Sequence, residues 1–67
     1  MSNSRLVKIN TVNSCYVYPL AGNDAIGHIV RTTKGFEAWA YKTGKGGFFD
    51  NPHTAQEFIE REQGLRP

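Results

Sequence analysis

The sequence predicts an α+β fold: an antiparallel sheet of three to five strands with one C-terminal helix packed on one face. Short segments that alternate apolar and polar residues follow one another, glycine-containing turns separate them, and a capped helical pattern comes last. With 67 residues, the chain is expected to form one domain over residues 1–67.

The N-terminal part is expected to contribute strands over residues 5–20, after a frayed end at residues 1–4. Apolar and polar residues alternate from Val7 to Asn10, as in a half-buried strand. Cys15-Tyr16-Val17-Tyr18 is rich in β-prone residues, and Pro19 then ends this strand or places it at a sheet edge.

Residues 26–49 are expected to form a three-stranded meander. Its strands are Ile26–Thr32, Gly35–Lys42 and the short Gly47–Phe49, and glycines lie in or beside both turns. The middle strand carries apolar residues on both faces, whereas one short helix covers only one face. Something else must therefore lie against Trp39 and Tyr41.

The first turn of the meander sets which side chains share a face. A three-residue turn, Thr33-Lys34-Gly35, is favoured because it needs a positive φ only at the glycine. The expected pairs are then Thr32 with Phe36, Arg31 with Glu37, Val30 with Ala38, and Ile29 with Trp39. The face expected beneath the helix carries Phe36, Ala38, Ala40 and Val30. The opposite face carries Ile29, Trp39 and Tyr41, edged by Arg31 and Glu37.

The helix is expected over residues 54–63. Thr54-Ala55-Gln56-Glu57 has the spacing of a capping box, in which the threonine hydroxyl and the glutamate each satisfy a backbone N–H. Phe58 and Ile59 supply an apolar stripe, and Gly64 is placed to end the helix. The remaining glutamates, Glu60 and Glu62, are expected on a solvated face.

Composition and charge point to a cytoplasmic protein without catalytic chemistry. The chain has 39% hydrophobic residues, and neither a secretory signal nor a membrane-spanning run of ~20 apolar residues is evident. Six cations and two anions lie in residues 1–49, whereas residues 50–67 hold two cations and four anions. An anionic partner would therefore meet the strands and turns rather than the helix.

No pattern of a metal, cofactor or catalytic site is present. His28, His53 and Cys15 are too far apart for the ligand spacing of a zinc site. The glycine-rich segment 44–47 lacks the Ser/Thr and the following helix of a phosphate-binding loop. So short a chain is also expected to lack a pocket of the ~300 Å³ that a small molecule needs, so no small-molecule substrate is expected.

Two function hypotheses follow, both for a non-enzymatic binding module. The first is self-association as a homo-dimer, since chains this small usually need a further stabilising element and a lone Cys15 forms no internal disulfide. Its expected interface residues are Val7, Ile9, Tyr16, Val17, Trp39 and Tyr41. The N-terminal strands could instead cover Trp39 within the same chain.

The second hypothesis is nucleic-acid binding, in which aromatic side chains stack on bases and nearby cations meet phosphates. The candidate residues are Arg31, Lys34, Trp39, Tyr41, Lys42 and Lys45.

A resemblance supports the second hypothesis. Gly27, Gly35-Phe36-x-Ala38, Phe49 and Thr54-Ala55-x-Glu57 resemble the three-stranded-sheet DNA-binding domains. These include the arm-binding domain of phage-type tyrosine recombinases and the plant ethylene-response domain, and the same pattern recurs in small phage or prophage proteins. The resemblance covers residues 27–59 and implies that the sheet face away from the helix enters the major groove. In this chain, the resemblance implies that the DNA-contacting face carries Arg31, Glu37, Trp39 and Tyr41.

Overall fold

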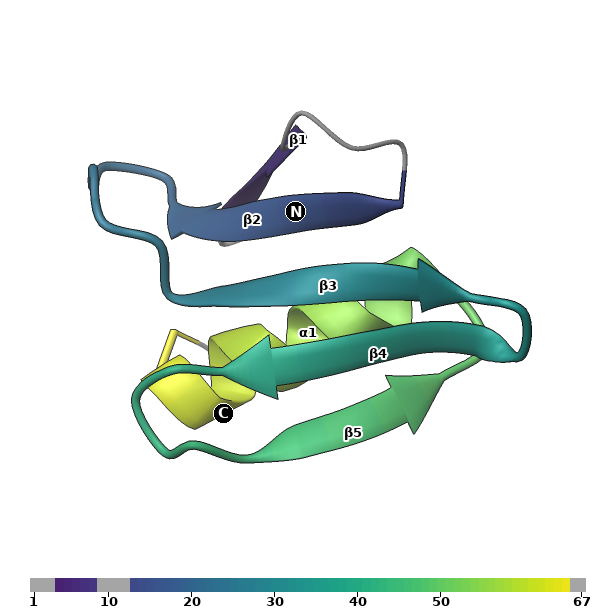
Figure 1. The fold of residues 1–67 in the computed structure, drawn as a ribbon. Helices are drawn as coiled ribbons and strands as arrows, with labels where there is room; N and C mark the ends of the chain where they lie inside the picture. The colour runs from purple at the N-terminus through teal and green to yellow at the C-terminus, as the bar shows by residue number, and fades with distance from the viewer. Residues whose placement is uncertain (1–3, 9–12, 66–67) are drawn as a thin grey trace.

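The computed structural model describes residues 4–8 and 13–65, which form a five-stranded antiparallel sheet with one helix across one face (Figure 1). Each strand pairs with the next along the chain, so the sheet order is the order of the sequence. The elements are β1 (Ser4–Lys8), β2 (Ser14–Pro19), β3 (Gly27–Thr32), β4 (Gly35–Ala40), β5 (Gly46–Phe49) and α1 (Pro52–Gln63). The predicted α+β class is confirmed, with five strands.

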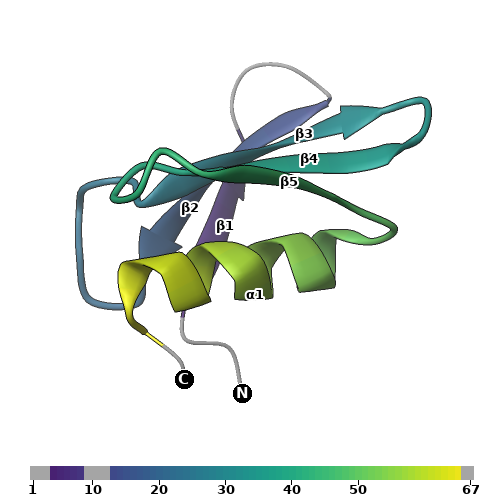
Figure 2. The ribbon, with the colours of Figure 1, turned by 90° about the horizontal axis from the view of Figure 1, so that it is seen from below.

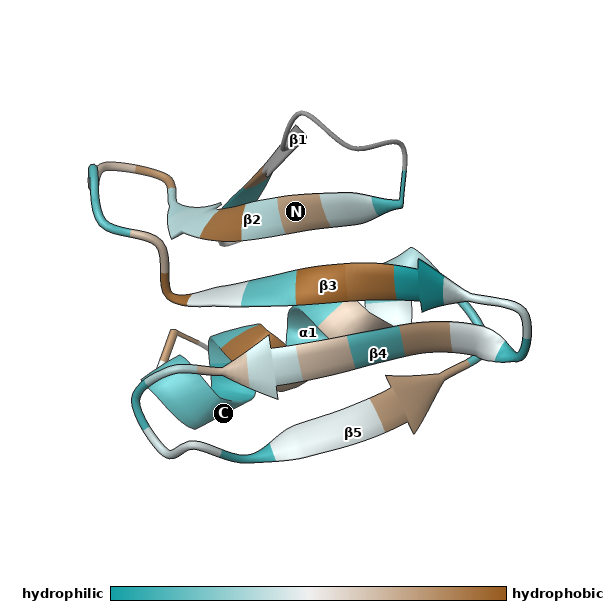
Figure 3. Cartoon of the chain, viewed as in Figure 1, coloured by the Kyte–Doolittle hydropathy of each residue, from teal (hydrophilic) through white to brown (hydrophobic). Residues whose placement is uncertain are grey.

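The molecule has two layers, with α1 lying along one side of the sheet (Figure 2). We call the sheet surface toward α1 the inner face and the opposite surface the outer face. Apolar colouring is strong in the middle of β3, the central strand of the sheet (Figure 3). The helix packs mainly on the neighbouring strand β4, with lesser contacts to β5 and β3, so it covers this apolar region only in part.

The core lies between the inner face and α1. Its buried residues come from β2, the residue before β3, β3 itself, β4 and the helix, and they are Val17, Ile26, Ile29, Ala38, Ala55 and Ile59. Small residues let the helix approach closely: a Cβ added at Gly27 would lie 2.8 Å from Cγ2 of Ile59. Phe36, Ala38 and Ala40 lie on the inner face, as the alternation of β4 predicts.

The predicted register between β3 and β4 is wrong by one residue. Thr32 pairs with Gly35, so the turn contains only Thr33 and Lys34. Neither turn residue has a positive φ: among the described residues only glycines do, and Gly35, which follows the turn, takes a φ of 144°. The Thr32 hydroxyl holds the turn by accepting from the Lys34 N–H and donating to the Gly35 carbonyl, each at 3.2 Å.

The shorter turn reverses the faces of β3. Arg31 pairs with Phe36, Ile29 pairs with Ala38, and His28 pairs with Trp39. Directly paired side chains of antiparallel strands share a face. Ile29 and Arg31 therefore lie on the inner face, whereas Val30, paired with Glu37, lies on the outer face.

The start of α1 also differs from the prediction. Asn51, rather than Thr54, is the N-cap, and Pro52 occupies the first helical turn. Oδ1 of Asn51 accepts from the Thr54 N–H at 2.8 Å and from the Thr54 hydroxyl at 3.0 Å. Because Thr54 lies within the first turn of the helix and not at its N-cap, the predicted capping box does not form. The helix therefore begins two residues earlier than predicted. Asparagine is a favoured N-cap residue, and proline is favoured in the first helical turn.

The end of α1 is as predicted. Gly64 adopts a left-handed conformation, with a φ of 90°. Its N–H donates to the Arg61 carbonyl at 3.1 Å, and the Leu65 N–H donates to the Glu60 carbonyl at 2.8 Å. This pair of bonds is a Schellman motif, which satisfies two of the last carbonyls of the helix.

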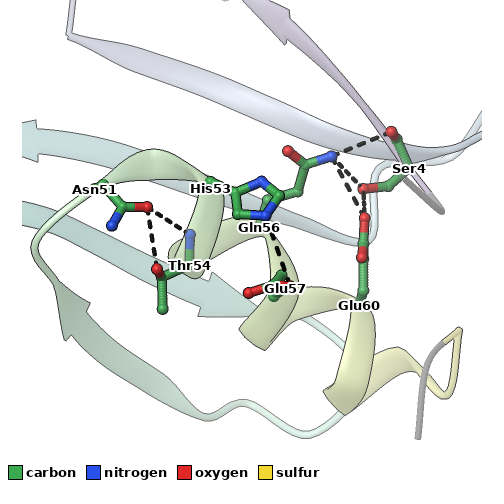
Figure 4. A network of polar contacts seen from close by, with 7 residues as sticks. All are labelled: Ser4, Asn51, His53, Thr54, Gln56, Glu57 and Glu60. Carbon is green, nitrogen blue, oxygen red and sulfur yellow. Dashed lines mark hydrogen bonds and ion pairs between the residues drawn. The ribbon is translucent and has the colours of Figure 1, made fainter. Parts of the chain in front are cut away.

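A buried polar network joins β1 to α1 (Figure 4). Ser4, Gln56 and Glu60 are 3%, 8% and 1% exposed. Nε2 of Gln56 donates to the Ser4 carbonyl at 3.1 Å and to the Ser4 hydroxyl at 2.7 Å, and this hydroxyl donates to Oε2 of Glu60. The expected solvated position of Glu60 and the expected frayed position of Ser4 are therefore wrong. Both predictions fail because β1 packs against the side of the helix that carries Gln56 and Glu60.

Candidate binding face on the outer side of the sheet

Aromatic side chains extend across the outer face from β2 to β5. The pairing places Tyr16 opposite His28 and His28 opposite Trp39. Tyr41 follows β4 directly, and Phe48 pairs with Glu37. Tyr16, Trp39, Tyr41 and Phe48 are 37%, 39%, 48% and 60% exposed, so this face is open in the single chain. We call Tyr16, Tyr18, His28, Trp39, Tyr41 and Phe48 the aromatic row.

The middle of the row is held by a hydrogen bond between neighbouring strands. Nδ1 of His28 lies 2.7 Å from the Tyr41 hydroxyl, and their ring centroids are 5.4 Å apart. Tyr16 and Tyr18 pack edge to face, with centroids 6.3 Å apart. The Arg5 guanidinium lies 5.0 Å from the centre of the Tyr18 ring, within the range of a cation–π contact.

Trp39 is fixed in position by two neighbours. Nε1 of its indole donates to Oε1 of Glu37 at 2.6 Å. The indole also lies against Gly46 on β5: a Cβ added there would stand 2.7 to 3.0 Å from three ring carbons. Gly46 therefore leaves the space in which the ring rests on the sheet.

The outer face carries little net charge. Among the strand residues whose side chains the structure describes, the charged ones on this face are Arg5 and Glu37, which have opposite signs. Burial, followed by the charges of Tyr16 and Tyr18, raises the pKa of Tyr41 above its ordinary value of 10.0. The Tyr41 hydroxyl therefore stays protonated and uncharged at neutral pH.

The six residues predicted for nucleic-acid binding do not come together. Trp39 and Tyr41 share the outer face, but Arg31 lies on the inner face because of the corrected register. Lys34 lies in the β3–β4 turn, at the opposite end of the strands from the two lysines of the β4–β5 turn. Of these two, Lys42 is exposed, and Nζ of Lys45 lies 4.0 Å from Oε1 of Glu62 on α1. The face implied by the resemblance thus loses its arginine.

The residues predicted for a self-association interface are also divided. Tyr16, Trp39 and Tyr41 lie in the aromatic row, whereas Val17 is 0% exposed in the core. Val7 belongs to β1, but its side chain and the whole of Ile9 lie outside the described residues.

Sequence reasoning missed Tyr18, His28 and Phe48 as members of this face. The alternation within β2 could have identified Tyr18, because side chains two positions apart in a strand lie on the same face. Tyr18 therefore shares a face with Tyr16 and not with Val17. His28 could not be placed with Trp39 without the correct β3–β4 register.

The described residues contain no group of three or more His, Cys, Asp or Glu side chains placed to hold a metal ion. His53 instead lies beside Glu57 at the start of α1, with Nε2 and Oε2 3.7 Å apart. In the part of the chain that the structure describes, no helix is long and apolar enough to cross a membrane.

Comparisons with protein-family models, with curated proteins and with solved structures gave no match. The resemblance to three-stranded-sheet DNA-binding domains therefore stays a prediction.

Proposed function

We propose that this chain is a non-enzymatic interaction module that self-associates through the outer face of its sheet. The observation that carries the proposal is the aromatic row, whose four most open members are 37% to 60% exposed. Tyrosine, tryptophan and phenylalanine are enriched at the centres of protein interfaces, where they bury large areas with few rotatable bonds.

The polar groups of this face favour burial in an interface. Glu37 already binds the Trp39 indole, and the Tyr41 hydroxyl is paired with His28. Burying polar groups that keep their hydrogen bonds avoids most of the penalty for losing water. A partner could therefore cover the row without leaving these groups unsatisfied.

A second copy of the chain fits this surface because a two-fold interface uses the same patch on both subunits. The molecule measures 30 × 24 × 24 Å. One such face is of the order of the ~800 Å² that each partner contributes to a standard interface. Since β2 brings Tyr16 and Tyr18 to the outer face, the N-terminal strands would take part in the dimer.

Analytical ultracentrifugation of wild type and two matched variants tests the proposal. Phe48 and Leu20 are 60% and 61% exposed, but only Phe48 belongs to the aromatic row. We expect a dimer at tens of micromolar, loss of the dimer in Phe48→Lys, and no change in Leu20→Lys. A wild-type monomer at these concentrations, or equal effects of both substitutions, would contradict the proposal.

Single-stranded nucleic-acid binding is the second candidate, supported by the open Trp39 ring on a sheet surface. Bases would stack on the aromatic row while lysines of the two turns meet phosphates. Quenching of Trp39 fluorescence by an oligonucleotide at 50 mM salt, weaker at 200 mM salt, is the expected result. Absence of quenching at the lower salt would exclude this candidate, whereas a blue shift with protein concentration alone favours the dimer.

A further inference from the structure

The inner face has a hollow that α1 leaves uncovered. The helix begins at Pro52 and packs mainly on β4, with lesser contacts to β5 and β3. Beside its first turn lies a hollow of about 310 Å³, whose apolar lining includes Leu6, Cys15, Ile29 and Phe36. Leu6 is 43% exposed there, although it points toward the same side of the sheet as buried Val17.

A second, polar hollow adjoins the first. It has a volume of about 450 Å³ and shares Asn13 and Arg31 with the apolar hollow, and it adds Thr32 and Thr33. The Arg31 N–H donates to the Asn13 carbonyl at 2.6 Å, which ties the two shared residues together. Arg31 therefore lies where the apolar hollow meets the polar hollow.

The positive charge of Arg31 indicates which kind of ligand could bind where the two hollows meet. Glu37, the expected partner of Arg31, lies on the other side of the sheet and binds Trp39. Within residues 4–8 and 13–65, no carboxylate lies within ion-pair distance of the Arg31 guanidinium. A guanidinium presents a planar fork of donors that matches a carboxylate, and it strengthens such a contact beside an apolar wall.

We propose that this hollow is a binding site for an amphipathic anion, specifically an unbranched aliphatic carboxylate. The hydrocarbon tail would occupy the apolar hollow, and the carboxylate would meet Arg31 at its border with the polar one. A volume of about 310 Å³ lies at the lower end of the range for small-molecule sites, which suits a tail of modest length.

This site is separate from the proposed self-association surface because it lies on the opposite face of the sheet. A chain that fails to dimerise can still bind the carboxylate, and a dimer can form without it. The sequence-based expectation of no small-molecule partner rested on size alone, and the hollow reaches that size.

A ¹H–¹⁵N NMR titration with decanoate, kept below its micellar concentration, tests the proposal. We expect saturable shifts at Cys15, Ile29 and Phe36, together with slower alkylation of Cys15 by iodoacetamide. Decyltrimethylammonium, which has the same tail and the opposite charge, should produce neither effect.

Two variants separate a specific site from general apolar binding. Arg31→Gln should weaken decanoate binding about tenfold, as expected for the loss of a hydrogen bond between charged groups. Lys34→Gln removes a nearby exposed cation that lines neither hollow and should leave the affinity unchanged. Shifts that do not saturate, that map to the aromatic row, or that persist equally in Arg31→Gln would overturn the proposal.

Discussion

Replacing Gly46 with alanine should displace the Trp39 indole from the sheet. The added Cβ would lie 2.7 Å from Cε3 and 2.8 Å from Cζ3 of the ring. Ordinary contacts of a Cβ begin at 3.4 Å, so the ring must move by about 0.7 Å or more. This movement would disturb the bond of 2.6 Å between Nε1 of Trp39 and Oε1 of Glu37.

The effect on the free energy of unfolding should be small, because two contributions oppose each other. A hydrogen bond to a charged group contributes about 1.5–3 kcal/mol, and exposure of the Trp39–Glu37 pair to water lowers this contribution. Replacing glycine with alanine raises the free energy of unfolding by about 0.4–1 kcal/mol where the native backbone suits alanine, because it restricts the unfolded chain. The backbone of Gly46 meets this condition, since Gly46 is not among the glycines with positive φ. The perturbation is therefore visible in the position of the ring rather than in stability.

The indole N–H cross-peak in a ¹H–¹⁵N spectrum measures this position directly. In Gly46→Ala the peak should move toward that of a water-exposed indole, and its exchange with solvent should become faster. Gly47→Ala is the matched control, because its Cβ would meet the Phe49 ring instead, at 3.1 Å. An unmoved indole peak in Gly46→Ala would refute the placement of Trp39 against β5.

Three further predictions concern the helix cap, the buried network and Tyr41. Asn51→Ala should lower the free energy of unfolding by about 1 kcal/mol in chemical denaturation, with a smaller loss in Thr54→Ala, which keeps the capping carbonyl group. Ser4→Ala should cost about 1–3 kcal/mol in the same measurement, because buried Glu60 loses a donor; an unchanged midpoint would contradict the network. The raised pKa of Tyr41 means that the unfolded chain loses this proton first as pH rises through 10.0. Stability should therefore fall above pH 10.0, and the fall should be shallower in Tyr41→Phe, as thermal melts across this range would detect.

Local patterns were sufficient for the order of the elements, the faces of β4 and the end of the helix. Alternation along one strand assigns Ala38 and Trp39 to opposite faces without knowledge of any partner. Gly64 ends the helix through its own backbone conformation. These features depend on residues close together in the sequence, which is why they could be predicted.

The predictions that were wrong are of two kinds. In some, neighbouring residues carry similar local signals, and in others the structure depends on contacts between residues far apart in the sequence. Asn51 and Thr54 are both good caps, and Pro52 decides between them by fitting the first helical turn. The β3–β4 turn shortens because the Thr32 hydroxyl bonds to its backbone, and this moves Arg31 away from the candidate face. Burial of Glu60 depends on Ser4, which lies 56 positions away.

The bond between Ser4 and Glu60 also bears on the order in which the chain folds. Each strand pairs with its neighbour in sequence, so the hairpins of β2 to β5 close short loops. The contact of β1 with α1 closes a loop of 56 residues and carries a larger entropic cost. β1 itself pairs locally with β2, so we expect this hairpin to form early and its contact with α1 to form late. In native-state hydrogen exchange, the β1–α1 contact at this sheet edge should open before the central strands, which would expose the Glu60 side chain to water.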